Sequence, residues 1–301
     1  AEIAEQLAAG ELDRRLAITS EDEMGRLAIA FNEMALAMQQ QISRLENLSR
    51  LQQRFVSDVS HELKTPLTTM KMASRVIFDS REKLDPGAAR SAELLISQIE
   101  RFETLLRDLL EVSRFDARAA ILETHEVDLK ALVVRSIDEI KGAGEVQVTL
   151  SAPAGPVLAI VDDRRIERII RNLLTNAADH CDHRGVAITI SQSEREVAIG
   201  VRDHGNGFTE REAERLFDRF WRADPSRARV RGGTGLGLSI ALEDATLHQG
   251  TLKAWGAPKR GAHFVLTLPK SPGIPIQDEL IPVLPSDESP TILPNLDAED
   301  L

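Results

Sequence analysis

The chain has 301 residues, of which 42% are hydrophobic and 28% are charged. This length corresponds to about two domains of ~150 residues, and the composition excludes a largely disordered or collagen-like chain. The formal net charge of -11 argues against a non-specific nucleic-acid surface, because phosphate binding needs a basic patch. No apolar run approaches the ~18 residues of a membrane-spanning helix, and the single cysteine, Cys181, is typical of a reducing compartment. The sequence from Ala1 onward has the pattern of a helix interior, so we expect the chain to be a fragment.

Two long helices are predicted in the first part of the chain. Gly10 is expected to end a short helix, and Ser20 is placed to cap the next one in a capping box with Glu23. Apolar residues then recur in steps of three and four, as in a coiled-coil seam, at Ile42, Leu45, Leu48, Leu51, Phe55, Val59 and Leu63. After Asp85-Pro86-Gly87, a second seam follows at Leu95, Ile99, Phe102, Leu106 and Leu109. We therefore expect an antiparallel hairpin that dimerises as a four-helix bundle.

The pattern changes after Asp116 to short strands that alternate with helices. Strands are predicted over 146–150, 157–161, 186–191, 197–202, 251–255 and 264–268, with helices near 130–140, 164–180 and 235–249. This order predicts an α/β or α+β domain of about 150 residues. Residues 271–301 hold six of the thirteen prolines, and their seven acidic and no basic residues carry -7 of the -11 net charge. We expect this tail to be disordered.

The first chemical candidate is His61, within Ser-His-Glu-Leu-Lys-Thr-Pro on the first long helix. A neutral imidazole is a nucleophile near pH 7, and the adjacent carboxylate of Glu62 can accept one ring proton. Thr65 lies four residues after His61, so both share a helix face and Thr65 can orient a water. Pro66 lacks an N–H and should kink or loosen the helix near Glu62. The alternative is a solvated helical histidine with an incidental glutamate neighbour.

Asn172 and Asn176 lie four apart on the predicted helix 164–180, opposite its apolar stripe. The stripe consists of Ile166, Ile169, Ile170, Leu173, Leu174 and Ala177. Amide oxygens on that polar face can complete the coordination of a hard cation such as Mg²⁺. Asp203 follows the strand 197–202 and begins Asp-His-Gly-Asn-Gly, where a carboxylate can accept from an exocyclic amine. The alternatives are an ordinary polar helix surface and a plain turn.

A glycine-rich run at 232–238 leads directly into the helix 239–248, where free N–H groups and the helix dipole favour phosphate. It is neither a Walker loop nor a Rossmann fingerprint, and a flexible loop is the alternative. Between the glycine clusters, aromatic residues and arginines at 216–222 indicate a lid that neutralises phosphate charge. Further arginines follow it at Arg227, Arg229 and Arg231.

This order of motifs resembles the sensor histidine kinases of two-component systems, over nearly all of residues 1–270. In that family's terms, 1–40 resembles part of a HAMP relay, 41–118 a dimerisation and histidine-phosphotransfer hairpin, and 119–270 a Bergerat-type α/β sandwich that binds ATP. The segment 220–227, with His248-Gln-Gly, further resembles the actinobacterial MtrB-type kinases, whose response-regulator partner is MtrA. The family's H box is matched by the segment from Phe55 to Leu67, and its N box by Asn172 and Asn176. The G1 box is matched by Asp203, Gly205 and Gly207, and the F box by Phe217 and Phe220. The G2 box is matched by Gly233, Gly235 and Gly237.

The resemblance implies a role for each matched residue. His61 would be the phosphoacceptor, Glu62 the base that assists its attack, and Thr65 the residue that positions water in phosphatase action. Asn176 and Asn172 would hold Mg²⁺. The residues implied to bind ATP are Asn172, Asn176, His180, Asp203, Gly205, Gly207, Phe217, Arg222, Gly233, Thr234, Gly235, Leu236 and Gly237.

The resemblance also implies partners and a location. The chain would form a homodimer, transfer its phosphoryl group to a response regulator and bind no nucleic acid directly. It would be the cytoplasmic portion of a membrane-anchored protein.

The chain departs from the family's motifs at two places. Asp179 stands where many relatives carry Lys or Arg, so a lid arginine would replace that phosphate contact. The last glycine motif, Gly261-Ala-His-Phe, matches the family's pattern only loosely. The cluster His180-Cys-Asp-His is expected to serve the nucleotide rather than bind zinc.

A gyrase-like or chaperone-like clamp ATPase, in which His61 is incidental, is one alternative function. A non-catalytic scaffold that dimerises and docks a regulator is the other.

Overall fold

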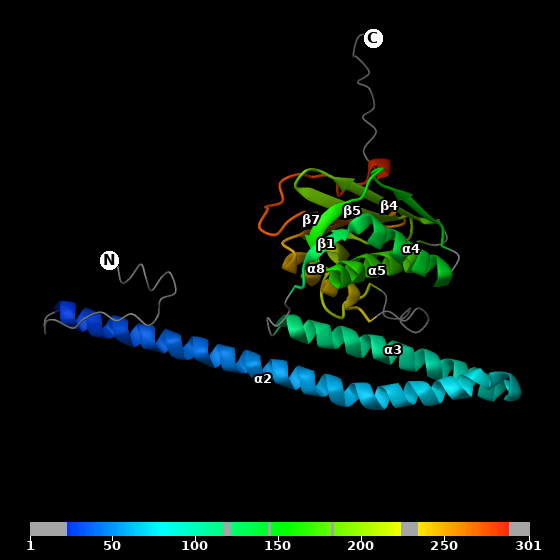
Figure 1. The fold of residues 1–301 in the computed structure, drawn as a ribbon, viewed down its shortest axis with the longest axis horizontal. Helices are drawn as coiled ribbons and strands as arrows, with labels where there is room; N and C mark the ends of the chain where they lie inside the picture. Colours follow the sequence, from blue (N-terminus) through cyan, green and yellow to red (C-terminus); the bar gives the residue numbers. More distant parts are fainter. Residues whose placement is uncertain (1–22, 117–121, 144–145, 182–183, 224–233, 289–301) are drawn as a thin grey trace, which may run out of the picture. The chain divides into compact units, whose positions relative to one another are not determined.

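The computed structural model describes residues 23–116, 122–143, 146–181, 184–223 and 234–288 (Figure 1). These residues divide into two compact units, and helix α2 belongs to one. Helix α3 as far as Val112 belongs to the other unit, together with the C-terminal domain. The predicted helix end at Gly10, the cap at Ser20 and the HAMP-like segment before Glu23 lie outside the described residues.

The N-terminal part contains two long helices, α2 (Glu23–Asp79) and α3 (Pro86–Asp116), and the short 3₁₀ helix η1 (Arg81–Lys83) lies between them in the sequence. Asp85 begins α3, because its Oδ1 accepts the backbone N–H groups of Gly87 and Ala88. Helix α2 continues through Pro66, where we expected a kink or a loosened turn, and Figure 1 shows it as one long, gently bowed helix. Among the described residues, no helix combines the length and apolar character that crossing a membrane requires.

Much of the predicted apolar seam is exposed in the single chain. Seam side chains that remain at least 42% exposed are Ile42, Leu48, Leu51, Leu95, Phe102 and Leu109. Leu106 is buried at 8% exposure. Exposed apolar side chains in a continuous helical stripe are typical of a surface that associates with a partner.

The C-terminal domain contains two sheets and three longer helices. Its elements are β1 (His125–Asp128), α4 (Leu129–Ala143), β2 (Val148–Ser151), β3 (Leu158–Val161), α5 (Asp163–His180), β4 (Val186–Gln192), β5 (Glu196–Asp203), α6 (Glu210–Ala213), α8 (Gly237–Leu247), β6 (Thr251–Ala257), β7 (Gly261–Pro269) and η2 (Ser286–Glu288). The larger sheet has the order β2-β4-β5-β7-β6, in which only β2 and β4 are parallel. Strands β1 and β3 form a separate antiparallel pair. The pattern-based prediction found β2 to β7 and the helices α4, α5 and α8 but not β1 or α6.

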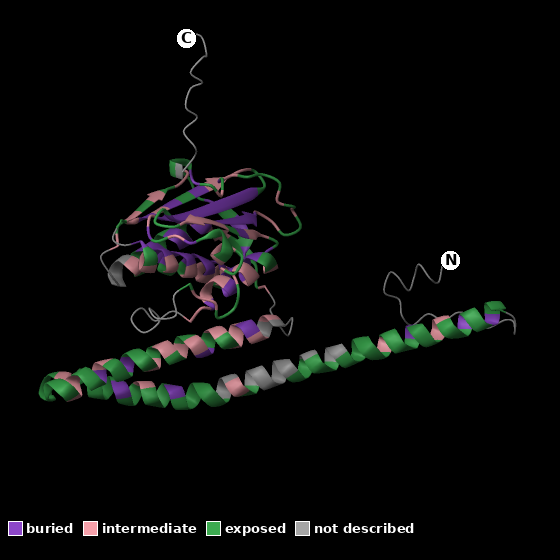
Figure 2. Ribbon diagram, turned by 180° about the vertical axis from the view of Figure 1, so that it is seen from behind, coloured by how far each residue is buried: buried purple, intermediate pink, exposed green. Residues whose placement is uncertain are grey.

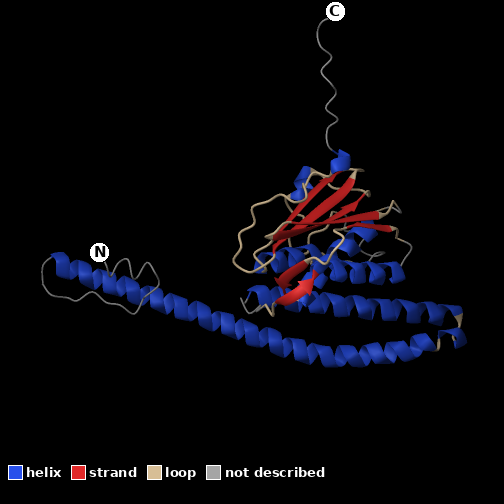
Figure 3. Cartoon of the chain, turned by 45° about the horizontal axis from the view of Figure 1, so that its top comes forward, coloured by secondary structure: helices blue, strands red, loops and turns tan. Residues whose placement is uncertain are grey.

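The core lies between the sheet and helices α4, α5 and α8, which cover one face (Figures 1 and 3). The stripe predicted for α5 is confirmed, because all six of its residues are buried. Strands β5 and β7 are buried along their whole length, as the purple central strands in Figure 2 show. Continuous burial of a strand requires cover on both faces of its sheet.

Residues 271–288, which belong to the tail predicted to be disordered, cover the second face of the sheet. The prediction of disorder is therefore wrong for these residues. Ile281 is buried against Ala198 and Val265, on the sheet face opposite the helices. The prolines and the absence of basic residues misled the prediction, because a short segment needs few apolar contacts when its backbone groups bind a preformed sheet. Residues 289–301 lie outside the described residues.

Candidate active site

Helix α5 presents Asn172 and Asn176 on its partly exposed face. The helix begins at the N-cap Asp162, whose side chain accepts the backbone N–H of Arg165. Asn172 donates from Nδ2 to the carbonyl oxygen of Gly237 at 2.9 Å, which joins α5 to the first residue of α8. The side chain of Asn176 has no hydrogen-bond partner among the described residues, so its amide oxygen is open to a ligand.

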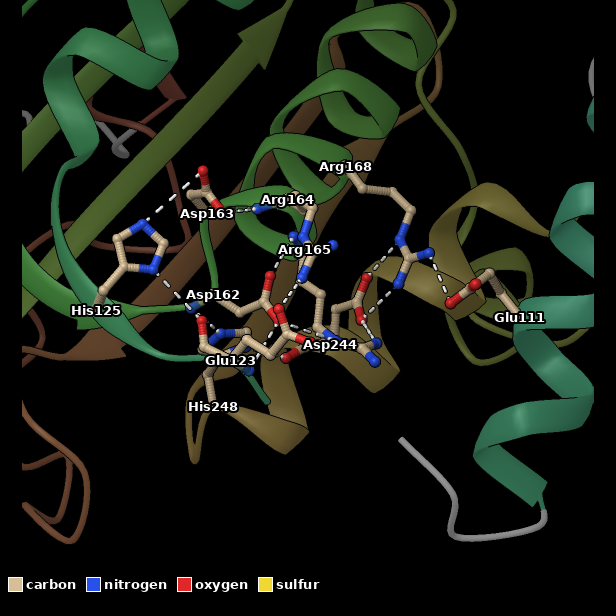
Figure 4. A network of polar contacts seen from close by, with 10 residues as sticks. All are labelled: Glu111, Glu123, His125, Asp162, Asp163, Arg164, Arg165, Arg168, Asp244 and His248. Carbon is tan, nitrogen blue, oxygen red and sulfur yellow. Dashed lines mark hydrogen bonds and ion pairs between the residues drawn. The ribbon is translucent and has the colours of Figure 1, made fainter. Parts of the chain in front are cut away.

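A buried charged network holds α5 and α8 together (Figure 4). Asp244 of α8 is fully buried, and its carboxylate accepts from Arg165 at 2.9 Å and from Arg168 at 2.8 and 2.9 Å. Arg168 also pairs with Glu111 of α3 at 2.8 Å, within the same compact unit. Since a buried carboxylate is stable only with such partners, this network fixes the spacing between the two helices.

His248 completes the network as a neutral imidazole. Its Nε2 accepts the backbone N–H of Asp162 at 3.1 Å, and its Nδ1 lies 2.7 Å from the carbonyl oxygen of Asp244, to which it donates in that tautomer. Burial lowers the pKa of His248, although the Asp244 carbonyl and the charges of Asp244 and Asp162 oppose the shift.

Asp203, at the end of β5, has one satisfied and one open carboxylate oxygen. Its Oδ1 accepts the backbone N–H groups of Gly205 at 2.9 Å and Ala262 at 3.3 Å. Its Oδ2 is buried and has no hydrogen-bond partner in the described part of the chain. Burial raises the pKa of Asp203, and the two backbone N–H groups partly offset that rise. A buried acceptor without a partner is costly and indicates a ligand donor.

Two glycines bring the backbone close around Asp203. A Cβ at Gly205 would lie 1.6 Å from the carbonyl oxygen of His180, so only glycine allows the loop to pack on the end of α5. A Cβ at Gly207, whose φ is +60°, would lie 1.9 Å from the carbonyl oxygen of Ala257. His180 itself is exposed beside this loop.

The residues expected to contact phosphates come from the connection between α6 and α8. Phe217 packs against the core, and Phe220 donates its N–H to the carbonyl oxygen of Gly235 at 2.9 Å. Thr234 donates from Oγ1 to Asp108 of α3 at 2.8 Å. Leu236 is fully buried, so its side chain belongs to the core, and its backbone N–H donates to Oγ1 of Thr234 at 3.2 Å. Gly233 lies outside the described residues. Arg222 is described, and it is partly exposed.

His61 lies within α2, and its side chain is not among those the structure describes. Glu62 and Thr65 are exposed on the same helix. The carbonyl oxygen of Thr65 accepts the hydroxyl of Thr69 at 3.2 Å. The helix thus carries Glu62 and Thr65 as exposed side chains.

The structure brings the N-box, G1 and G2 residues together around α5 and α8. The described residues contain no group of three or more His, Cys, Asp and Glu side chains placed for a metal, and Asp182 and His183 of the His180 cluster lie outside them. Sequence reasoning missed the pairing of Asp244 with Arg165 and Arg168. The signal that could have indicated this pairing is two arginines three apart on α5 together with Asp244 in the otherwise largely apolar α8.

Three family models match the chain in sequence order. Residues 1–40 match the HAMP domain, 51–118 match the His Kinase A (phospho-acceptor) domain, and 161–272 match the histidine kinase-, DNA gyrase B- and HSP90-like ATPase. The chain is 49% identical over 286 residues to the sensor histidine kinase MtrB of Mycobacterium leprae. This alignment covers 94% of this chain and 51% of that protein. It is 36% identical to the signal transduction histidine-protein kinase AfsQ2 of Streptomyces coelicolor, over 92% of this chain and 52% of that protein. The chain thus spans about half the length of these relatives.

Solved structures share the fold. Full-length ShkA in complex with AMPPNP aligns with a TM-score of 0.62 at 23% identity, over 71% of this chain and 45% of that one. The histidine kinase AdeS of Acinetobacter baumannii aligns with a TM-score of 0.50 at 22% identity, over 70% of this chain and 98% of that one. The ordered set of domain matches and the similarity along 94% of the sequence show that the chain belongs to the sensor histidine kinases.

Proposed function

We propose that this chain is the catalytic part of a protein-histidine kinase that transfers the γ-phosphoryl group of ATP to His61 and then to an aspartate of a response regulator. The observation that carries the proposal is the buried, unpartnered Oδ2 of Asp203, next to glycines that exclude any larger side chain. That oxygen is placed to accept from the amino group of adenine.

The nucleotide site extends from Asp203 to the beginning of α8. Asn176 and Asn172 would hold Mg²⁺ through their amide oxygens, since the Nδ2 of Asn172 is already engaged with Gly237. When bound, the metal ion neutralises phosphate charge. Gly233, Thr234, Gly235, Leu236 and Gly237 would present backbone N–H groups to the phosphates at a helix N-terminus. Arg222 would approach the γ-phosphate, a role that the carboxylate of Asp179 cannot fill without a cation.

Transfer requires the C-terminal domain to bring the γ-phosphate to α2. A ring nitrogen of His61 forms the new bond to phosphorus while the bond from phosphorus to the β,γ-bridging oxygen breaks and ADP leaves. Glu62 accepts the proton from the other ring nitrogen. Positioning and charge neutralisation supply most of the rate, as phosphoryl transfer leaves little covalent chemistry to the protein.

The apolar seam supports the proposal of a homodimer, because its side chains are too exposed for a lone helical hairpin in water. A response-regulator receiver domain would dock on this bundle, and similarity to MtrB makes an MtrA-like regulator the first to test. Thr65 would position the water that later removes the phosphoryl group from the regulator. The HAMP match supports a membrane-anchored sensor of which this chain is the cytoplasmic portion.

A labelling experiment tests the function. With γ-labelled ATP and Mg²⁺, the chain should gain acid-labile phosphate, and His61→Gln should gain none. The matched control is His125→Gln, an exposed histidine of the C-terminal domain, which should label as the wild type does.

Three results would contradict the proposal. Label retained in His61→Gln would overturn the assignment of the phosphoacceptor. ATP turnover without labelled protein would instead favour a clamp ATPase, and absence of nucleotide binding would favour a scaffold.

A further inference from the structure

Residues 271–288 run across the sheet face that the helices leave uncovered, and we name them the strap. The strap is anchored first at the beginning of β5, where the fully buried Glu196 accepts the backbone N–H groups of Gln277 and Asp278. In its middle, Ile281 packs on Ala198 and Val265, and the carbonyl oxygen of Val283 lies 3.0 Å from Nδ1 of His263. The segment therefore follows β5 from its first residue toward its last.

The strap ends on the two chain neighbours of Asp203. Oδ2 of Asp287 lies 3.2 Å from Nη2 of Arg202 and 3.1 Å from Nε2 of His204. Arg202 is buried, whereas Asp287 is about half exposed. Burial alone would raise the pKa of Asp287, but the hydrogen bonds and charge of Arg202 and the hydrogen bond of His204 lower it, so the carboxylate is held in its charged form.

Arg202 connects this contact to the site that holds the Asp203 carboxylate. Its Nη1 donates to the carbonyl oxygen of Asp203 and its Nη2 to that of Arg260, both at 2.8 Å. Ala262, two residues after Arg260, supplies one of the N–H groups that bind Oδ1 of Asp203. One guanidinium thus ties the end of β5 to the beginning of β7, where Ala262 holds Oδ1 of Asp203.

We propose that the strap is a positioning element of the nucleotide site, in which Asp287 holds Arg202 and His204 so that the carboxylate of Asp203 faces adenine. Asp203 lies on the opposite side of β5 from Arg202, because neighbouring residues of a strand alternate between its faces. The strap thus acts through the backbone and does not touch the nucleotide. The inference rests on the proposed function, since it takes adenine as the ligand of Asp203.

The test compares Asp287→Asn, Asp287→Glu and the control Asp278→Asn. Asp278 lies in the same strap, but it contributes its backbone N–H and its side chain is exposed. The affinity for ADP with Mg²⁺ and the KM and kcat of autophosphorylation are measured for each variant. We expect Asp287→Asn to raise the ADP Kd and the ATP KM about three- to tenfold with kcat changed less than twofold, because the base is bound equally in the ground state and the transition state. Asp287→Glu should recover much of the affinity, and Asp278→Asn should match the wild type.

Loss of kcat at unchanged KM, an unchanged ADP Kd in Asp287→Asn, or an equal effect in Asp278→Asn would overturn the proposal. A wild-type chain that binds ADP but does not label His61 would refute the kinase function alone, and the ADP measurements would still decide the role of the strap. A wild-type chain that binds no ADP would refute both.

Discussion

Glu62 and Thr65 on α2 are exposed, whereas Asp203 and Asn172 in the C-terminal domain are held by residues distant in sequence. Asp203 depends on the N–H of Ala262, and Asn172 depends on Gly237. The proposed phosphoacceptor segment therefore needs little more than a helix, while the proposed nucleotide site requires a folded sheet and two fixed helices. Substitutions on α2 should change chemistry without changing stability, and substitutions behind the nucleotide site should change both.

The sharpest test of the first half of this comparison is Glu62→Gln. Removal of a general base costs about 10²- to 10⁴-fold in rate, so the initial rate of His61 labelling should fall by that factor. The melting temperature and the ADP affinity should stay at wild-type values, because Glu62 is exposed on its helix. A lowered melting temperature in this variant would break the distinction between the two regions.

Asp244→Asn tests the second half. The substitution leaves Arg165 and Arg168 facing a neutral group inside the domain, and breaking such a buried pair should cost roughly 3 kcal/mol of unfolding free energy. ADP affinity should fall as well, since the spacing of α5 and α8 places Asn172 against Gly237. Denaturant titration and calorimetry measure the two effects, with the exposed Asp138→Asn on α4 as control. Loss of stability with intact ADP affinity would show that the network supports the fold alone.

A smaller effect is expected in the pH dependence of stability. Burial lowers the pKa of His248 in the folded state from its ordinary value of 6.5, so the unfolded chain binds this proton more readily. The stability contributed by His248 is therefore complete above pH 6.5 and is lost as the pH falls through the lowered pKa, with a slope of at most ~1.4 kcal/mol per pH unit. His263 titrates with the same sign, and the raised pKa of Asp203 acts in the opposite direction.

The difference between the wild type and His248→Gln isolates this contribution. Denaturant unfolding followed from pH 8 to pH 5 should give a shallower decline for the variant. Parallel curves for the two proteins would show that His248 does not carry the predicted proton.

Thr65→Ala should have the smallest effect on phosphorylation. The rate of His61 labelling should change less than about twofold, since Thr65 takes no part in binding ATP or in forming the new bond. Alanine at an exposed helix position should raise stability by a few tenths of a kcal/mol. Dephosphorylation of the response regulator should instead be slowed, as measured by the loss of label from the regulator. Unchanged dephosphorylation would remove Thr65 from that role.

The limits of sequence reasoning follow the same division. The hairpin, the buried stripe of α5 and the motif residues follow from local periodicity and from the resemblance. The pairing of Asp244 with Arg168 joins residues 76 apart, and the contact of Asp287 with Arg202 joins residues 85 apart, so neither is visible in any local pattern. The strap was taken for a disordered tail because its prolines and acidic residues are typical of disorder, although its anchors lie in β5 and β7.

The central claim is that the open oxygen of Asp203 reads the amino group of adenine. A binding cycle tests it directly, with ATP and a purine riboside triphosphate that lacks the 6-amino group, each titrated into the wild type and Asp203→Asn. A hydrogen bond to a charged acceptor contributes about 1.5–3 kcal/mol, so loss of the amino group should weaken binding to the wild type roughly ten- to a hundredfold. In Asp203→Asn the amide oxygen stays with the N–H groups of Gly205 and Ala262, and the two nucleotides should bind alike. An equal loss in both proteins, or no loss in the wild type, would contradict the claim.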